Sequence, residues 1–156
     1  MIGDNSVQTI PELYLCNINP SQETEIKYKI MESLLTKISE EAYSQNIIPI
    51  FALAPSIFQV NKALWSELLV PKYDQNQNYD KSYPNKRMTT FANENNLFMI
   101  DLLPTLNSAY DEGYILYNKK EQHWTEKGNE IVAYTLQSFI DSISTKSSNF
   151  RLENIN

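Results

Sequence analysis

Short apolar runs alternate with longer amphipathic stretches along this chain, and that alternation limits the folds that it can form. Residues 12–18 (ELYLCNI), 47–54 (IIPIFALA) and 96–103 (NLFMIDLL) are rich in apolar residues, as expected of β-strands that are covered on both faces. The order strand, helix, strand, helix, strand, helix is typical of a parallel sheet with right-handed crossovers. We therefore expect an α/β fold with three parallel strands.

Three stretches have the apolar spacing of helices. Residues 21–46 begin with Ser21, a good N-cap residue, and residues 84–95 have proline in their first turn. The last helix follows Trp124, with Thr125 as its N-cap. The apolar positions predict which side chains face the core. These are Ile26, Ile30, Leu34, Leu35 and Ile38 in the first helix, Met88, Phe91 and Ala92 in the second, and Val132, Leu136, Phe139, Ile140 and Ile143 in the third.

The remaining segments are expected to be irregular. Residues 70–85 are polar and rich in tyrosine, which predicts a long surface loop that is either a substrate lid or a plain insertion. Residues 103–124 are expected to form the loop that leaves the third strand. We expect one domain over residues 1–145 and a polar, disordered tail over residues 146–156.

Composition and charge argue against several classes of function. The chain has 156 residues and a formal net charge of −6, and its scattered basic residues do not suit a nucleic-acid partner. One cysteine, Cys16, and one histidine, His123, cannot form an internal disulfide or a Cys/His zinc site. With only three glycines, the glycine-rich motifs that bind dinucleotides and nucleoside phosphates are absent. We therefore expect no metal and no cofactor.

No targeting segment is recognisable. The opening MIGDNSVQTI has neither a basic start nor an apolar run, and no stretch is long and apolar enough to span a membrane. The expectation is a cytoplasmic protein as the sequence is written, or an exported one if an amino-terminal portion is missing.

The single histidine has a position and a neighbour that suit catalysis. Ligands of parallel sheets bind at the carboxyl ends of the strands, and the loop from the third strand brings His123 to that edge. Glu121 can accept a hydrogen bond from one imidazole nitrogen and leave the other free to take a proton from a hydroxyl nucleophile. A histidine beside Trp124 is also common as a packed loop residue, so a structural role stays open.

The segment EQHWTEKGNEIVA, residues 121–133, resembles the final block of the SGNH, or GDSL-like, hydrolases. In that family Asp-x-x-His, or Asp-x-His-Trp, precedes a glycine and an apolar helix. The order of the other elements is also similar, with ELYLCNIN, a long helix, IPIFALAPS, a second helix and FMIDL before the histidine. The resemblance covers roughly residues 12–145 and is most specific in the last block.

This resemblance implies a three-layer αβα, flavodoxin-like fold and an ester-cleaving or acyl-transferring activity. His123 would be the base, and Glu121 would be the acid that orients it. Asn19, or less readily Asn17, would donate to the oxyanion. Either asparagine can equally be a turn or cap residue beside Pro20.

Three features depart from the family pattern. The acid is Glu121 instead of aspartate, the glycine block has no counterpart before Leu13, and only two residues precede Gly3, which leaves no room for the first strand. The first two strands of an SGNH domain are therefore expected to be missing, apparently with the nucleophile. Ser6 in GDNS is a nucleophile candidate that lies one position late, and Ser56 in APS is more typical of a loop cap.

Three kinds of function fit these observations. The first is a hydrolase or acyltransferase that acts on a small-molecule or carbohydrate ester. The second is an inactive SGNH-like module that binds a glycan or a protein through an aromatic platform of Tyr73, Tyr79 and Tyr83. The third is an interaction domain whose open sheet edge pairs with a missing amino-terminal segment or with a second copy of the chain.

Overall fold

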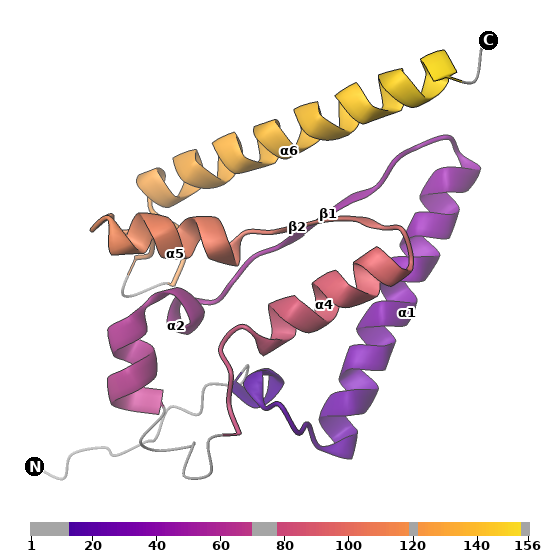
Figure 1. The fold of residues 1–156 in the computed structure, drawn as a ribbon. Helices are drawn as coiled ribbons and strands as arrows, with labels where there is room; N and C mark the ends of the chain where they lie inside the picture. The colour runs from indigo at the N-terminus through magenta and orange to yellow at the C-terminus, as the bar shows by residue number, and fades with distance from the viewer. Residues whose placement is uncertain (1–12, 70–77, 119–121, 154–156) are drawn as a thin grey trace, which may run out of the picture.

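The structure is a computed structural model that describes residues 13–69, 78–118 and 122–153 (Figure 1). It is mixed α/β and mostly helical, and within these residues the sheet has two parallel strands. The elements in chain order are the 3-10 helix η1 (Leu13–Cys16), α1 (Gln22–Ser44), β1 (Ile50–Leu53), α2 (Ile57–Val60), the π-helix η2 (Leu64–Leu69), α4 (Tyr83–Glu94), β2 (Phe98–Asp101), α5 (Leu103–Asp111) and α6 (Glu126–Glu153).

The sheet confirms two of the three predicted strands. Ile50 of β1 pairs with Phe98 of β2, and Leu53 pairs with Asp101, so the strands run parallel and in register. α4 leads into β2 and packs on it, as a crossover helix does. Continuous apolar runs therefore identified the positions of both strands, although their side chains are half-buried or exposed and not covered on both faces as predicted.

The third predicted strand, over residues 12–18, is wrong, because η1 forms one turn of 3-10 helix there. The spacing of three places Leu13 and Cys16 on one side of the turn, where both are buried against Phe58. The carbonyl of Cys16 accepts a hydrogen bond from the Asp80 N–H at 2.8 Å. The apolar residues that suggested a strand are thus buried by a helical turn instead.

α1 buries a different face from the one that we expected. Ser21 caps the helix as predicted, since its hydroxyl accepts from the Thr24 N–H at 3.2 Å. Leu35 is buried as predicted, together with Thr24, Tyr28 and Ser39. The other four predicted core residues of this helix are instead exposed. They are Ile26, Ile30, Leu34 and Ile38.

An ion-pair cluster accounts for this orientation of α1. Arg87 of α4 donates to Glu25 of α1 at 2.6 and 2.8 Å and to Glu32 at 3.1 Å. Its guanidinium carbon lies 4.2 Å from the centre of the Tyr28 ring. The hydrogen bonds to Glu25 raise the pKa of the guanidinium, which therefore stays charged. These contacts fix one side of α1 against α4 and leave the isoleucine-rich stripe facing away.

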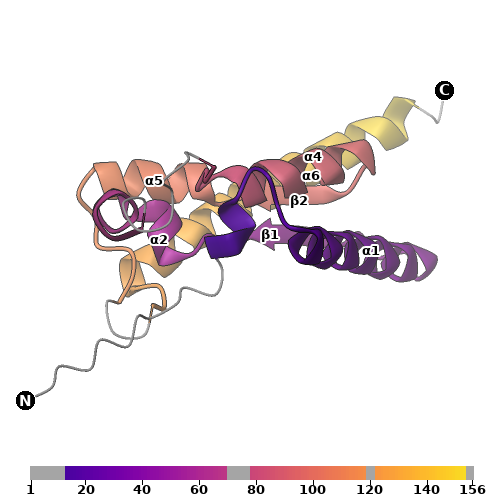
Figure 2. The same cartoon turned by 90° about the horizontal axis from the view of Figure 1, so that it is seen from below.

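Helices lie on both faces of the sheet (Figures 1 and 2). On one face, Met88 of α4 belongs to a cluster that includes Met99 of β2. On the other face, Ile100 of β2 packs against a cluster that includes Leu106 of α5 and Val132 of α6. Successive β2 side chains thus point to opposite faces, as the pleat requires.

The last part of the chain is more helical than predicted. α5 occupies the first half of the predicted loop at residues 103–124, with Pro104 in its first turn. α6 continues to Glu153, into the stretch where we expected a disordered tail. Neither α6 nor any other helix of the described residues is long and apolar enough to cross a membrane. In α4 and α6, Met88, Ala92, Val132 and Ile143 are buried as predicted, Phe91, Leu136 and Phe139 are partly buried, and Ile140 is exposed.

The burial of Cys16 gives a first testable expectation. Burial, and to a smaller extent the Asp80 carboxylate, raises the pKa of the Cys16 thiol from 9.0 to about 12. At pH 8 the folded thiol should therefore hold roughly 1,000-fold less thiolate than the unfolded one. We expect reaction with Ellman's reagent to be slower in the native chain by at least that factor than in urea.

The same shift has a consequence for stability. Because the unfolded thiol ionises first, Cys16 favours the folded state below about pH 9 and loses this contribution as the pH rises toward 12. Cys16→Ala is expected to remove that part of the alkaline loss of stability. A native reaction rate within about tenfold of the unfolded rate would show that the thiol is accessible and ionised.

Candidate functional site

His123 lies in a pocket at the carboxyl end of β1. The pocket has a volume of about 460 Å³ and adjoins Ala54 and Pro55, the two residues that follow the strand. This is the edge at which parallel sheets bind ligands. The lining residues are Ala54, Pro55, Tyr117, Gln122, His123, Trp124 and Asn129.

A tight loop holds the main chain of His123 in place. Tyr117 and Trp124 form an antiparallel bridge, and inside it the Asn118 N–H donates to the His123 carbonyl at 2.8 Å. The Gln122 N–H donates to the Asn118 carbonyl at 2.9 Å. Gln122 has φ of +57°, in the left-handed region, which turns the chain back toward the bridge. The backbone on both sides of the imidazole is therefore tied down.

Tyr117 anchors this loop to the end of β1. Its hydroxyl donates to the Pro55 carbonyl at 2.8 Å, and the side chain is buried. Burial raises the pKa of the Tyr117 hydroxyl, so it stays protonated and can keep donating. Trp124 packs against the same cluster and also lines the pocket. The pocket thus has one wall from β1 and one from the loop before α6.

The start of α6 depends on a residue without a side chain. A Cβ on Gly128 would lie 2.5 Å from the Leu116 carbonyl oxygen, so the helix can approach the loop this closely only with glycine. The Gly128 N–H donates to the Thr125 hydroxyl at 3.1 Å, which confirms Thr125 as the N-cap. The Thr125 N–H donates to the Leu116 carbonyl at 2.9 Å. These contacts place the helix directly behind His123.

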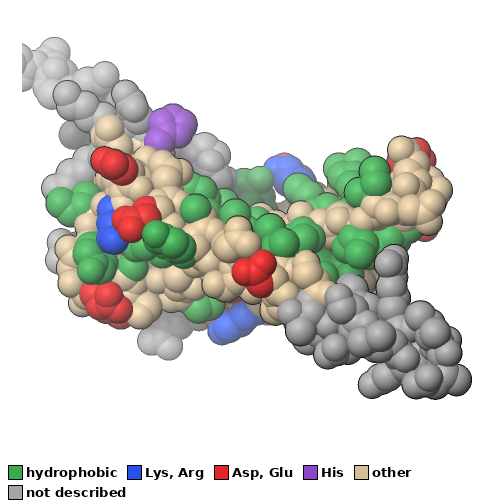
Figure 3. Space-filling model, turned by 90° about the horizontal axis from the view of Figure 1, so that it is seen from above, with side chains coloured by type: hydrophobic (Ala, Val, Ile, Leu, Met, Phe, Trp, Pro, Cys, Tyr) green, Lys and Arg blue, Asp and Glu red, His purple; other side chains and the backbone are tan. Residues whose placement is uncertain are grey.

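The imidazole of His123 is exposed (Figure 3). No side chain within residues 13–69, 78–118 and 122–153 is hydrogen-bonded to it. Glu121 and Ser6, the predicted acid and nucleophile, lie outside the described residues. Of the three residues predicted to form the triad, only His123 is therefore among the described residues.

The predicted oxyanion donors lie away from the residues that line this pocket. Asn19 is exposed, and its amide donates to the Asn78 side chain at 3.4 Å. The Asn17 side chain accepts from the Asn19 N–H at 2.8 Å, which is the turn role that we left open. Neither asparagine lines the pocket of His123.

Ser56 has a separate position at the end of β1. It is the N-cap residue of α2, in agreement with the cap role that we favoured, and its N–H donates to the Gln59 side chain at 2.9 Å. It follows Pro55, which lines the pocket of His123, but Ser56 itself lines a different, larger cavity. The Ser56 hydroxyl therefore lies one residue after the histidine pocket in sequence, at the same end of β1.

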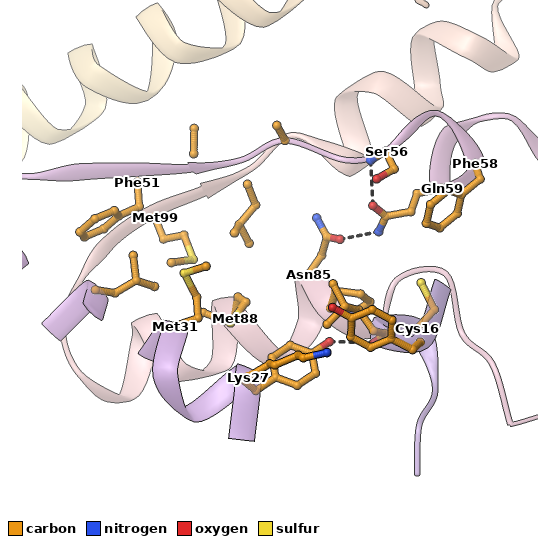
Figure 4. Close-up of a pocket in the computed structure, with 18 residues that line it drawn as sticks. Cys16, Lys27, Met31, Phe51, Ser56, Phe58, Gln59, Asn85, Met88 and Met99 are labelled. Carbon is orange, nitrogen blue, oxygen red and sulfur yellow. Dashed lines mark hydrogen bonds between the residues drawn. The ribbon is translucent and has the colours of Figure 1, made fainter. Parts of the chain in front are cut away.

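The sequence did not reveal a buried polar chain in that larger cavity (Figure 4). The Gln59 amide donates to the Asn85 side chain at 2.8 Å, and the Asn85 amide donates to Asp101 at 2.6 Å. Gln59 and Asn85 are both buried, and Asp101 also accepts from the Leu103 N–H at 2.9 Å. Gln59, Asn85 and Asp101 come from α2, α4 and β2, and no sequence pattern predicts their pairing.

The predicted tyrosine platform is not assembled by the described residues. Tyr73 lies outside them, as do residues 70–77 of the predicted surface loop. Tyr79 packs against the cluster of η1, and Tyr83 meets the Tyr28 ring edge-on with centroids 6.3 Å apart. Both rings are thus partly used for packing.

Within the described part of the chain, no three histidine, cysteine, aspartate or glutamate side chains gather in a way that could hold a metal ion. Comparison with models of protein families, with curated proteins and with solved structures gives no match.

Proposed function

We propose that this chain is an SGNH-type ester hydrolase or acyltransferase domain in which His123 is the catalytic base. The observation that carries the proposal is an exposed imidazole, on a loop fixed by backbone hydrogen bonds, in a pocket at the carboxyl end of β1. The helices on both faces of the parallel sheet support the finer fold proposal, a three-layer flavodoxin-like domain. The resemblance of residues 121–133 to the SGNH histidine block supports the reaction class.

The proposed chemistry is acyl transfer through a serine. His123 takes the proton of a serine hydroxyl as the oxygen attacks the ester carbonyl, and the tetrahedral intermediate collapses when the protonated imidazole gives that proton to the departing alcohol. Water, or an acceptor alcohol, then attacks the acyl-serine carbonyl while His123 takes its proton. The protonated imidazole returns that proton to the serine oxygen as the bond between the serine and the acyl group breaks. Glu121 would hold the imidazole in the required tautomer.

A fluorophosphonate probe tests this proposal directly, because it reacts with activated serines. Because the nucleophile of the family pattern has no clear counterpart here, the proposal requires another serine of this chain, such as the candidate Ser6, to replace it. We then expect one serine of the folded chain to be labelled, and mass spectrometry would identify which one. His123→Ala should reduce the labelling rate by at least about 100-fold, because the base is lost. Gln137→Ala, an exposed change on α6, serves as the matched control and should be labelled like the original chain.

Two outcomes would contradict the proposal. A folded chain with no labelled serine has no activated nucleophile of its own. Labelling that persists in folded His123→Ala shows that another group activates the serine. Thermal unfolding of each variant separates either result from a loss of folding.

A further inference from the structure

The larger cavity, which Ser56 lines, lies between α1, α4 and β1 (Figure 4). Its volume is about 640 Å³, which is within the range of pockets that hold small molecules. Ala54 lines both this cavity and the pocket of His123, so both reach the carboxyl end of β1. The activity proposed above assigns no ligand to it.

The chemistry of the cavity wall changes from one end to the other. Figure 4 shows Phe51 and Met99 at one end and Ser56 and Gln59 at the other. The first end is apolar, whereas the second has a hydroxyl and a buried amide. Apolar walls that provide contact area, with a few polar groups that fix orientation, are typical of ligand pockets. A wall of this kind fits a molecule with an apolar tail and a polar head.

Three methionines line the apolar part of the cavity. They are Met31 of α1, Met88 of α4 and Met99 of β2. Methionine side chains are unbranched and flexible, so they adapt to the shape of whatever they contact. Met31 is 49% exposed, which places it at the rim of the cavity. This part of the wall suits a flexible, unbranched hydrocarbon chain.

The apolar end also favours a hydrocarbon chain over a segment of peptide. Every peptide unit carries polar groups that need hydrogen-bond partners when they are buried. A peptide beside β1 could pair with that strand on one side only. On its other side, Leu35, Met88 and Met99 have no group that could donate to it or accept from it strongly. A hydrocarbon chain has no polar groups to leave unsatisfied.

The polar end favours an uncharged head group. The Asn85 amide, which lines the cavity, donates to the Asp101 carboxylate at 2.6 Å, so a carboxylate lies one hydrogen bond behind the wall. Lys27, a cation that also lines the cavity, pairs with Glu23 at 2.7 Å. A carboxylate or phosphate head would therefore be repelled by Asp101. A hydroxyl can both donate and accept, and so matches the Ser56 hydroxyl.

We propose that this cavity binds an amphipathic small molecule with an unbranched hydrocarbon tail and an uncharged, hydroxyl-bearing head. The tail lies against Met31, Met88 and Met99, and the head lies beside Ser56 at the carboxyl end of β1. The inference is independent of the proposed activity, because binding here requires neither His123 nor a nucleophile.

Titration with octanol and with octanoate, followed by NMR of the isotope-labelled chain, tests the proposal. Trp65 stacks on Phe58 with ring centroids 6.1 Å apart, and Phe58 lines the cavity. The indole N–H signal of Trp65, assigned by its loss in Trp65→Phe, therefore reports on occupancy. We expect octanol to shift this signal saturably, and octanoate to bind at least about tenfold more weakly. Each methylene from hexanol to octanol should lower the dissociation constant by roughly two- to fourfold.

Two variants of α1 locate the ligand. Met31→Glu places a charge on the cavity wall and should weaken octanol binding by at least about tenfold. Ile30→Glu is the matched control, because Ile30 is the adjacent residue, is 55% exposed and does not line the cavity. It should bind octanol like the original chain.

Three outcomes would overturn the proposal. The first is a Trp65 signal that octanol does not shift saturably. The second is equal binding of octanol by Met31→Glu and Ile30→Glu, which would place the ligand elsewhere. The third is octanoate that binds as tightly as octanol, which would rule out an uncharged head as the preferred ligand. His123→Ala should bind octanol normally, so this inference and the proposed activity can fail separately.

Discussion

Asn85→Asp is expected to destabilise the folded chain by about 3–5 kcal/mol at pH 7. Asn85 is buried, and its amide donates to the Asp101 carboxylate at 2.6 Å. The substitution replaces that donor with a second carboxylate of almost the same shape. Two negative charges would then lie in hydrogen-bond contact, one on a buried and one on a half-buried side chain, and Asp101 would lose its donor.

The effect should depend strongly on pH, with a defined sign. In the folded variant the two carboxyl groups can share one proton, so the pair holds a proton at a pH where both groups are ionised in the unfolded chain. The folded state then binds more protons than the unfolded state, and stability falls as pH rises. Urea unfolding should therefore show the smallest difference from the original chain near pH 4 and the largest near pH 7.

Two further variants make this prediction specific. Asn85→Asp combined with Asp101→Asn exchanges the amide and the carboxylate, which restores a donor and an acceptor, and should recover most of the lost stability. Asn93→Asp places the same charge on an exposed position of α4 and should cost less than about 1 kcal/mol. If the single and double variants were equally destabilised at pH 7, repulsion between the carboxylates would not be the cause.

The structure also shows which kinds of sequence pattern predict a fold reliably. The runs at residues 47–54 and 96–103 contain the two strands, Ile50–Leu53 and Phe98–Asp101, although the strand side chains are half-buried or exposed and not covered on both faces. The run at 12–18 fitted a strand equally well, but its apolar residues at a spacing of three also fit one helical turn. A short apolar run does not distinguish a strand from a helical turn. In the structure the turn is stabilised because Leu13 and Cys16 pack against Phe58.

α1 shows a different limit. Its apolar positions were predicted to face the core, but only Leu35 among them is buried. The rest of the buried side carries Thr24, Tyr28 and Ser39. The orientation depends on Arg87, which lies on another helix and pairs with Glu25 across the fold. A pattern within one helix does not contain this information. An exposed stripe of this strength instead indicates a further surface that is yet to be covered.

The sequence predicted where the candidate site lies, but not which residues surround His123 and hold its loop. The topology placed His123 at the carboxyl edge, and the structure has it next to the residues that follow β1. The loop that carries it is fixed by the Tyr117 hydroxyl bond to Pro55, two residues far apart in sequence. Pairs of residues far apart in sequence, such as Gln59 and Asn85, form when the elements pack together, and no periodic pattern in the sequence predicts them.

The second large effect is expected at Leu106, which lies in the core cluster that also contains Tyr117 of the histidine pocket. Its side chain is fully buried, at 0% exposure, in the cluster formed by α5, α6 and the loop at Leu116 and Tyr117. Leu106→Ala removes apolar contacts and leaves a cavity where the neighbours cannot close in. We expect a loss of about 3–4 kcal/mol in the free energy of unfolding, measured by urea at pH 7.

The location of Leu106 also predicts which backbone amides should exchange faster in Leu106→Ala. The cavity lies under the loop whose bridge from Tyr117 to Trp124 fixes His123, so hydrogen exchange at the Thr125 amide should accelerate together with global unfolding. Ile115→Ala removes a side chain that is 74% exposed and should change stability by less than about 0.5 kcal/mol. If Leu106→Ala cost no more than this control, the cluster beneath the histidine loop could not be the core that holds the loop in place.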